Sequence, residues 1–221
     1  MKDPASHALF PASRVDAVVV AASLGGPRTL EEILGALPAA FPAPILVAQH
    51  LYGHSPSYLP QMLQRRTPLA VRHAVADDVL RAGVVYVAPP GRHLLVTAGG
   101  RCALLDEPRV SFARPAADLL FASAVDAFGA RTLGVVLTGR LFDGAAGAQA
   151  IRRAGGLVLA QDPATCRAPE MPRAAIRQGP AHLVLPPSAL AAALVRLAAA
   201  PGAALGGARG APGQALGAGA S

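Results

Sequence analysis

Residues 18–27 read VVVAASLGGP, and this stretch decides the fold. Its first five residues are all apolar, which is typical of a parallel strand covered on both faces. Gly25 and Gly26 permit a sharp bend, and Pro27 suits a first helical turn because its missing N–H would be unpaired there. The stretch therefore predicts a strand, a tight turn and a helix, with Ser23 at the bend.

The predicted turn places Ser23 beside backbone N–H groups at a helix N-terminus, which stabilise negative charge. A hydroxyl that attacks a carbonyl generates such a charge, so the turn suits a nucleophile with an adjoining oxyanion site. The same serine also suits the cap of the helix, and glycine turns of this kind bind phosphate groups. This stretch alone leaves the three roles open.

Further strands and helices alternate along the chain. We expect strands at residues 16–22, 45–48, 133–138, 157–160 and 183–185, helices at 27–37, 57–64, 116–128, 145–154 and 188–199, and a short helix within 165–178. Such alternation implies parallel strands with right-handed crossovers. Because ligands bind at the carboxyl ends of these strands, we expect Ser23, His50 and Asp143 to meet in one cleft.

Residues 67–110 differ in character from the rest. Strand-like runs at 69–74, 84–88, 93–97 and 102–105 are separated by turn residues, which predicts an antiparallel hairpin or meander. The predicted fold is therefore α/β, with a doubly wound, mostly parallel sheet, helices on both faces and an appended antiparallel hairpin. We expect a flexible leader at 1–14, one domain at 15–200 and a disordered Gly/Ala-rich tail at 201–221.

Composition limits the classes of function. The 221 residues contain 52% apolar residues, but no run of membrane-spanning length and no signal-peptide h-region, so we expect a cytoplasmic protein without membrane insertion. The net charge of +7 comes almost wholly from scattered arginines, and aromatics are only 4%, which argues against a nucleic-acid partner. The charge suits an acidic protein partner. Cys102 and Cys166 lack metal or disulfide spacing, and no metal or cofactor is expected.

A serine nucleophile needs a histidine base, and the base needs a partner that fixes its tautomer. Ser23, His50 and Asp143 supply that set in the order Ser, His, Asp. The α/β-hydrolase order differs, and its G-x-S-x-G elbow is absent because Ser23 lies in AASLG. The alternatives are that His50 has only a structural role and that Asp143 caps the helix that begins just after it.

Six motifs in one order carry a resemblance to a known family. They are AASLGG at 21–26, AQH at 48–50, YVAPP at 86–90, LTG at 137–139 with DGA at 143–145, AQD at 160–162 and MPR at 171–173. The chain resembles the catalytic domain of CheB-type protein-glutamate methylesterases of bacterial chemotaxis over about residues 15–199. The resemblance implies a Ser23, His50 and Asp143 triad that hydrolyses γ-glutamyl methyl esters on the cytoplasmic helices of methylated chemoreceptors, and that deamidates some glutamines there.

The same resemblance indicates further contacts and differences. Substrate or oxyanion contacts are expected at Leu24, Gly25, Gly26, Arg140 and Met171. The family often has threonine where this chain has Leu24, and it has small residues where this chain has bulkier ones at 140–142. The alternative is a catalytically degenerate relative that docks on a signalling partner or binds an anion at the glycine turn.

Regulated members of the family carry a phospho-receiver domain, and the residues before Val15 are too few to form one. We therefore expect activity that does not respond to phosphodonors, with any regulation supplied by a separate regulatory chain or by recruitment to the receptor.

For the other polar residues we expect surface, capping or ion-pair roles rather than catalysis. His54 and His93 are expected at the surface, and His73 and His182 without a special role. Asp162 and Glu170 suit solvated charges or caps, and Arg114 and Arg173 suit either substrate acid groups or surface ion pairs.

Overall fold

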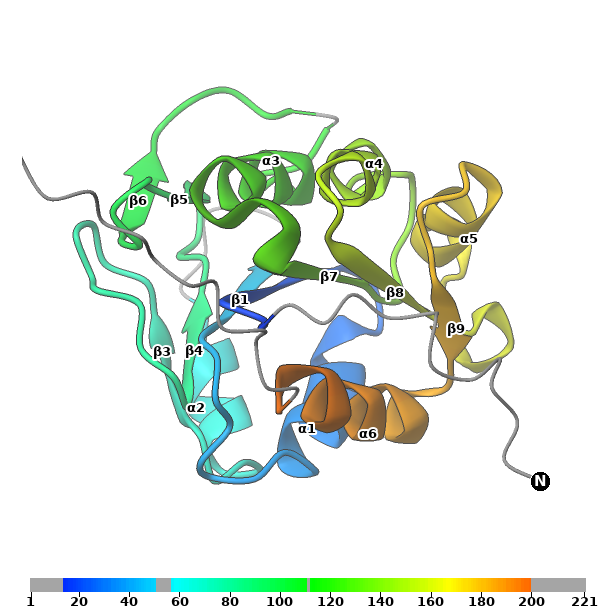
Figure 1. Cartoon of the computed structure of the whole chain (residues 1–221), viewed down its shortest axis with the longest axis horizontal. Helices are drawn as coiled ribbons and strands as arrows, with labels where there is room; N and C mark the ends of the chain where they lie inside the picture. Colours follow the sequence, from blue (N-terminus) through cyan, green and yellow to red (C-terminus); the bar gives the residue numbers. More distant parts are fainter. Residues whose placement is uncertain (1–13, 51–56, 111, 200–221) are drawn as a thin grey trace, which may run out of the picture.

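A computed structural model describes residues 14–50, 57–110 and 112–199, and these form a seven-stranded parallel sheet with helices on both faces (Figure 1). Its strands are β1 (Ala17–Ala22), β2 (Ile45–Gln49), β3 (Ala70–His73), β4 (Val84–Val87), β7 (Thr132–Val136), β8 (Leu157–Gln161) and β9 (Leu183–Leu185). The strand order is β3-β4-β2-β1-β7-β8-β9, and every neighbouring pair is parallel. The doubly wound α/β fold predicted from the sequence is confirmed.

Helices lie in two layers on either side of the sheet. They are α1 (Gly26–Gly35), α2 (Leu59–Gln64), α3 (Ala117–Phe128), α4 (Ala145–Arg153), α5 (Glu170–Arg177) and α6 (Pro187–Ala198), with short 3-10 turns η2 (Gly129–Arg131) and η3 (Pro163–Thr165). One layer consists of α1, α2 and α6, whose apolar side chains share a core cluster with one sheet face. The other consists of α3, α4 and α5, which pack on the opposite face. Within the described residues, none of the helices is long and apolar enough to cross a membrane.

Strand β1 lies at the centre of the sheet, and all six of its residues are buried. Val18 and Val20 contribute to the core beneath α1 and α6, whereas Ala17 and Val19 contribute to the core beneath α3 and α4. Because successive side chains point to opposite faces, a strand buried on both sides must be apolar at every position. This explains the continuous apolar run in the sequence.

The predicted antiparallel region is smaller than expected, and the expected hairpin between residues 84–88 and 93–97 is wrong. Strands β3 and β4 belong to the parallel sheet, with β4 between β2 and β3. Only β5 (His93–Val96) and β6 (Cys102–Leu105) form an antiparallel pair. The turn after β4 resembled a hairpin turn in sequence, but Val85 and Val87 are fully buried and hold β4 as an interior strand of the main sheet.

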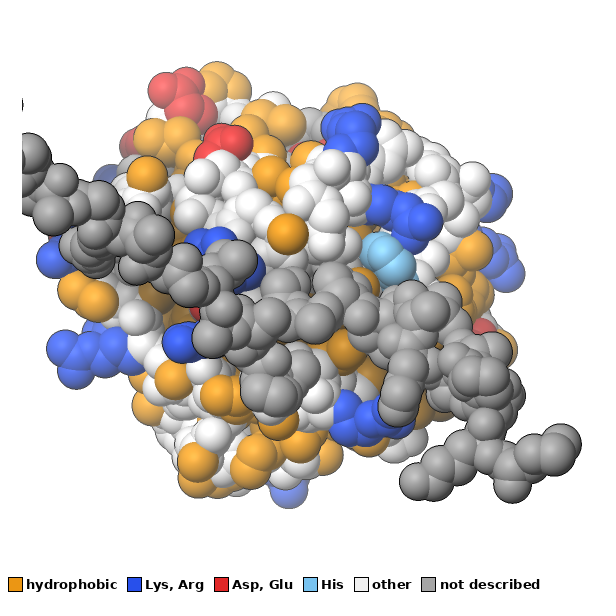
Figure 2. All heavy atoms as spheres, viewed as in Figure 1, with side chains coloured by type: hydrophobic (Ala, Val, Ile, Leu, Met, Phe, Trp, Pro, Cys, Tyr) orange, Lys and Arg blue, Asp and Glu red, His pale blue; other side chains and the backbone are white. Residues whose placement is uncertain are grey.

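The order of strands reverses beside β1, because β2, β4 and β3 follow one another on one side and β7, β8 and β9 on the other. Crevices for ligands form at the carboxyl ends of strands at such a switch point. The loops that follow β1, β2 and β7 carry Ser23, His50 and Asp143. On the face drawn in Figure 2, basic side chains are spread over several elements rather than gathered in a band. Apart from Arg14, the expected leader lies outside the described residues, as does the tail.

Candidate active site

Ser23 lies in a tight turn between β1 and α1, as the sequence predicts. Its N–H donates to the carbonyl of Thr138 at 3.0 Å, and its carbonyl accepts the N–H of Gly26 at 2.9 Å. Gly25 caps α1 in the left-handed conformation with φ of 90°, which costs glycine little and other residues more. These bonds fix the backbone of Ser23 between β1 and the end of β7.

A second glycine allows the chain to pass close beneath Ser23. A Cβ atom on Gly139 would lie 2.7 Å from the Cβ of Ser23 and would overlap the sulfur of Met171. Met171 is fully buried, and its N–H donates to the carbonyl of Gly139 at 2.9 Å. Met171 therefore supports the site from below, and its burial does not support the expected contact with substrate.

The N–H groups of the glycine turn divide into bonded and free ones. The N–H of Gly26 is bonded within the turn, so its expected place in an oxyanion site is not supported. The N–H groups of Leu24 and Gly25 have no acceptor among the residues that the structure describes. They remain the candidates for binding an oxyanion beside Ser23.

His50 follows β2 and is tied to the Ser23 turn through its neighbour Gln49. The N–H of His50 donates to the carbonyl of Ala22 at 2.8 Å. The buried side-chain amide of Gln49 donates to the carbonyls of Ser23 and His50, both at 2.9 Å. One side chain thus holds the backbones of the candidate nucleophile and base together, a role that the sequence analysis did not assign.

Asp143 is almost fully buried and faces His50. Its Oδ2 lies 2.7 Å from Nε2 of His50 and also accepts the N–H of Ala117 at 2.7 Å, while Oδ1 accepts the N–H of Asp118 at 3.0 Å. The carboxylate therefore lies at the N-terminus of α3, where negative charge is favoured. The alternative role as cap of the following helix is wrong, because Gly144 occupies that position in α4 with φ of 93°.

Two cavities open beside Ser23 and His50, and both residues line both of them. The Leu24 cavity, of about 400 Å³, is lined by Ser23, Leu24, Gly25, Pro27, Arg28, Gln49, His50 and Arg167. The Phe112 cavity, of about 230 Å³, is lined by Ser23, His50, Arg109, Phe112, Ala113, Arg114, Arg140 and Leu141. A larger apolar cavity of about 510 Å³ lies between β9 and α6, and no serine, cysteine or histidine lines it. We therefore place the candidate active site at the Leu24 and Phe112 cavities.

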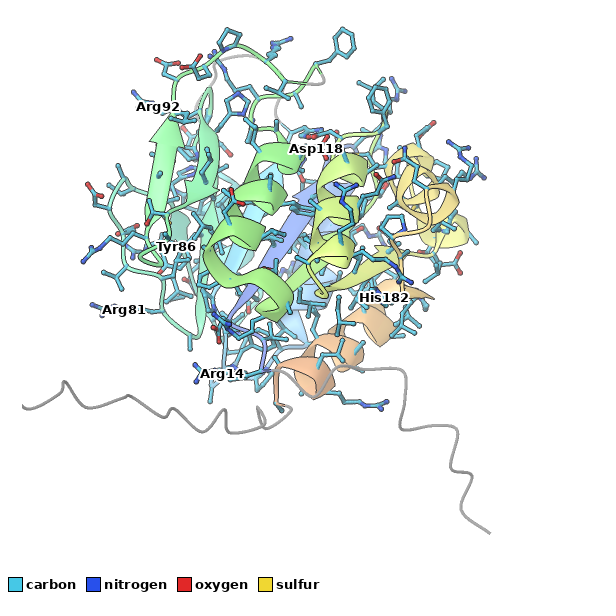
Figure 3. The ribbon with its side chains drawn as sticks, turned by 45° about the horizontal axis from the view of Figure 1, so that its top comes forward. Arg14, Arg81, Tyr86, Arg92, Asp118 and His182 are labelled. Atoms are coloured by element: carbon cyan, nitrogen blue, oxygen red, sulfur yellow. The ribbon has the colours of Figure 1, made fainter. Side chains whose placement is uncertain are left out.

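Asp118 lies at the start of α3, beside α4 (Figure 3). It forms a reciprocal arrangement with Asp143. Its Oδ1 accepts the N–H groups of Gly144 at 3.0 Å and Gly147 at 2.7 Å, which belong to the start of α4. Asp143 thus holds the start of α3, in which Asp118 lies, and Asp118 holds the start of α4, which follows Asp143. The approach requires glycine at 147, because a Cβ there would lie 3.1 Å from the Cα of Asp118. The sequence shows Asp118 in the first turn of a predicted helix, but nothing in it indicates a bond to α4.

Burial raises the pKa of Asp118 to about 6, and the nearby Asp143 charge adds to the rise while the N–H groups of α4 oppose it. The unfolded chain releases this proton near the ordinary value of 3.8. The folded state therefore holds the proton more tightly, and the contribution of Asp118 to stability is present below about pH 4 and lost as the pH rises through about 6.

We expect Asp118→Asn to remove this part of the pH dependence while it keeps an oxygen acceptor for α4. From pH 4 to pH 7, the free energy of unfolding of the wild type should fall relative to that of the variant. Urea midpoints of both proteins across this range measure the difference, and the shared titration of all other groups cancels. A difference that stays constant with pH would contradict the shifted ionisation of Asp118.

For one further polar residue, His93, the expected surface position is wrong. His93 is fully buried rather than at the surface: its Nδ1 accepts the N–H of Ala116 at 3.1 Å, and Nε2 donates to the carbonyl of Pro108 at 3.0 Å. It thereby joins β5 to the start of α3. Arg114 pairs with Asp106 at 3.3 Å. His54 lies outside the described residues. In the part of the chain that is described, no group of three His, Cys, Asp or Glu side chains is placed to hold a metal ion.

The geometry defines a doubly wound α/β domain in which a serine turn and a His–Asp pair meet at the switch point of the sheet. The chain belongs to the CheB methylesterase family, which matches residues 18–194. It is similar to the Thermotoga maritima CheB methylesterase catalytic domain, with a TM-score of 0.80 and 35% identity over 83% of this chain and 98% of that one.

Two relatives known from sequence extend the comparison. The protein-glutamate methylesterase FrzG of Myxococcus xanthus is 44% identical over 81% of this chain and 54% of its own length. A protein-glutamate methylesterase/protein-glutamine glutaminase of Anaeromyxobacter dehalogenans is 46% identical over 84% of this chain and 54% of its own length. The chain thus spans about half the length of these relatives.

Proposed function

We propose that this chain is a serine hydrolase that cleaves γ-glutamyl methyl esters on a protein substrate. The observation that carries the proposal is the 2.7 Å bond between His50 and buried Asp143, made where both cavities expose Ser23 and His50. A histidine held by a buried carboxylate beside a serine in a tight turn is the arrangement that nucleophilic acyl transfer requires.

The bond to Asp143 decides which nitrogen of His50 acts as the base. The N–H group at Nε2 donates a hydrogen bond to the carboxylate. In the neutral ring Nδ1 therefore carries no proton, and it is the nitrogen that can receive the proton of Ser23. No described residue hydrogen-bonds Oγ of Ser23, and substrate binding must bring Oγ and Nδ1 into contact, as is common for catalytic bonds that tighten in the complex. Asp143 in turn is held by two N–H groups of α3, which fixes the imidazole ring.

The reaction then proceeds in two halves. Oγ of Ser23 attacks the ester carbonyl carbon while Nδ1 of His50 takes the hydroxyl proton, and the N–H groups of Leu24 and Gly25 face the negative oxygen. The tetrahedral intermediate expels the methoxy group, which leaves as methanol with the proton from His50. Water, deprotonated by His50, next attacks the acyl-enzyme and releases the glutamate carboxylate and the free serine. Replacement of methanol by ammonia as the leaving group gives glutamine deamidation.

The substrate class follows from the family. Methylated cytoplasmic helices of chemoreceptor-type signalling proteins are the proposed partner, and the relative from Anaeromyxobacter dehalogenans is named for both the methylesterase and the glutaminase reactions. The alternative is a relative that binds such a partner without hydrolysis. The bulkier turn at residues 140–142 is the feature that favours this alternative, because it borders the Phe112 cavity.

We expect the purified chain to release methanol from a methylated receptor fragment and to leave an unmodified glutamate behind. Mass spectrometry of the fragment and a methanol assay measure the two products in equal amounts. The rate should rise with pH between pH 5 and 8, because a general base must be unprotonated to accept the proton of Ser23. A folded chain that binds the fragment and releases no methanol across pH 5 to 8 would establish the binding alternative instead.

A further inference from the structure

Arginines line the two cavities on either side of the candidate nucleophile. Arg28 and Arg167 line the Leu24 cavity, and Arg109, Arg114 and Arg140 line the Phe112 cavity. Among the described residues, neither cavity is lined by an aspartate or a glutamate. These arginines come from separate parts of the chain, so their gathering is a result of the fold.

Four of these guanidinium groups have no carboxylate partner among the described residues. Arg28, Arg109, Arg140 and Arg167 are exposed, and none of them forms an ion pair with a carboxylate of the described residues. Arg114 differs, because it pairs with Asp106 and donates to the carbonyl of Glu107 at 3.0 Å. Unpaired charges of one sign around a cleft attract and orient a ligand of the opposite sign.

Each cavity also carries apolar side chains beside its arginines. Leu24 and Pro27 line one cavity, and Phe112 and Leu141 line the other. Phe112 is 78% exposed and Leu141 is 51% exposed, so both offer apolar surface to a ligand. Both cavities beside Ser23 therefore offer the same pairing of cationic and apolar groups.

We propose that the two cavities bind an acidic amphipathic segment, with carboxylates on both sides of the ester that is cleaved. Arg28 and Arg167 bind carboxylates on one side and Arg109 and Arg140 on the other, through charge-assisted hydrogen bonds. The apolar side chains of the segment pack on Leu24 and Pro27 at one end and on Phe112 and Leu141 at the other. This inference rests on the proposed function and specifies its substrate.

The test uses two synthetic peptides that contain one γ-methyl glutamate. In the acidic peptide the flanking polar residues are glutamates, and in the neutral peptide they are glutamines. We expect Arg28→Gln and Arg140→Gln each to lower kcat/KM for the acidic peptide about two- to fivefold, the effect of an exposed ion pair. The double variant should lose roughly tenfold, because the two sites lie in different cavities and their effects add. Each variant should lower kcat/KM less for the neutral peptide than for the acidic peptide, because the neutral peptide has no flanking carboxylates to lose.

Arg81→Gln is the matched control, because Arg81 is exposed on the loop before β4, at the opposite edge of the sheet, and the variant loses the same charge. Binding of both peptides to the Ser23→Ala protein, measured by fluorescence anisotropy, tests the surface without any hydrolysis. Tighter binding of the acidic peptide, weakened by Arg28→Gln and Arg140→Gln and by salt, supports the proposal even if no ester is cleaved. Equal binding of the two peptides, or an equal effect of Arg81→Gln, overturns it while leaving the proposed esterase activity intact.

Discussion

Replacement of Ser23 by alanine is expected to lower the rate of ester hydrolysis by roughly 10⁴- to 10⁶-fold. The residual rate comes from the N–H groups of the turn and from substrate binding, which the substitution leaves in place. Stability should change by less than about 1 kcal/mol, because Oγ of Ser23 bonds no described residue and the Cβ that packs beside Gly139 is retained. Methanol release and urea unfolding measure the two effects separately.

Ser123→Ala is the matched control for this variant. Oγ of Ser123 accepts the N–H of Val96 at 3.0 Å and donates to the carbonyl of Leu120 at 2.9 Å, in the core beneath α3. Its loss leaves a buried N–H without a partner and should cost about 1–3 kcal/mol of stability, with turnover unchanged in the folded fraction. The two serine variants should therefore show opposite patterns. A folded Ser23→Ala protein with near wild-type turnover would exclude Ser23 as the nucleophile.

Asp143→Asn should lower turnover by about 10⁴-fold if the comparison with serine proteases holds. The carboxylate serves three donors at once: Nε2 of His50 and the N–H groups of Ala117 and Asp118. An asparagine has only one oxygen, so its NH₂ group must face one of these donors. The imidazole then loses the partner that fixes its tautomer, or α3 loses a bond at its N-terminus. Stability should fall as well, by about 1–3 kcal/mol for one unsatisfied buried donor.

Asp126→Asn makes the same chemical change on an exposed residue near the other end of α3, and it should alter neither turnover nor stability. Single-turnover kinetics at saturating substrate separate a chemical defect from a binding defect. We expect Asp143→Asn to affect kcat far more than KM, because Asp143 is 1% exposed and does not line either cavity. A variant that keeps its kcat and loses only stability would show that Asp143 serves as a structural cap for α3 alone.

Local signals in the sequence account for most of what was predicted correctly. The apolar run before Ser23 and the glycines after it specify strand, turn and helix within ten residues, and the structure confirms that unit. The alternation of such units predicts a parallel sheet, and the placement of Ser23 and His50 just after two strands then predicts a common edge. Asp143 follows a third strand of the predicted sheet and was expected at the same edge, and the structure places it 2.7 Å from His50.

The features that the sequence did not predict depend on contacts between distant segments. Strand β4 pairs with β2 and β3 because its side chains are buried on both faces of the main sheet. The turn residues after β4 instead indicated a hairpin. His93 reads as a polar residue near a turn, yet it is buried because two backbone groups from 15 and 23 residues away bond its ring. No local pattern distinguishes such a histidine from an exposed one.

The sequence by itself determined the α/β architecture, the serine turn and the family, because these depend on residue patterns within single strand–turn–helix units. Only the tertiary structure decided that Asp143 holds α3 while Asp118 holds α4, and that arginines from four separate loops and helices surround Ser23. The physical reason is that a carboxylate bonds whichever N–H groups packing brings to it. Packing is set by the whole sheet and by close approaches such as that at Gly147, not by the neighbours of a residue in sequence.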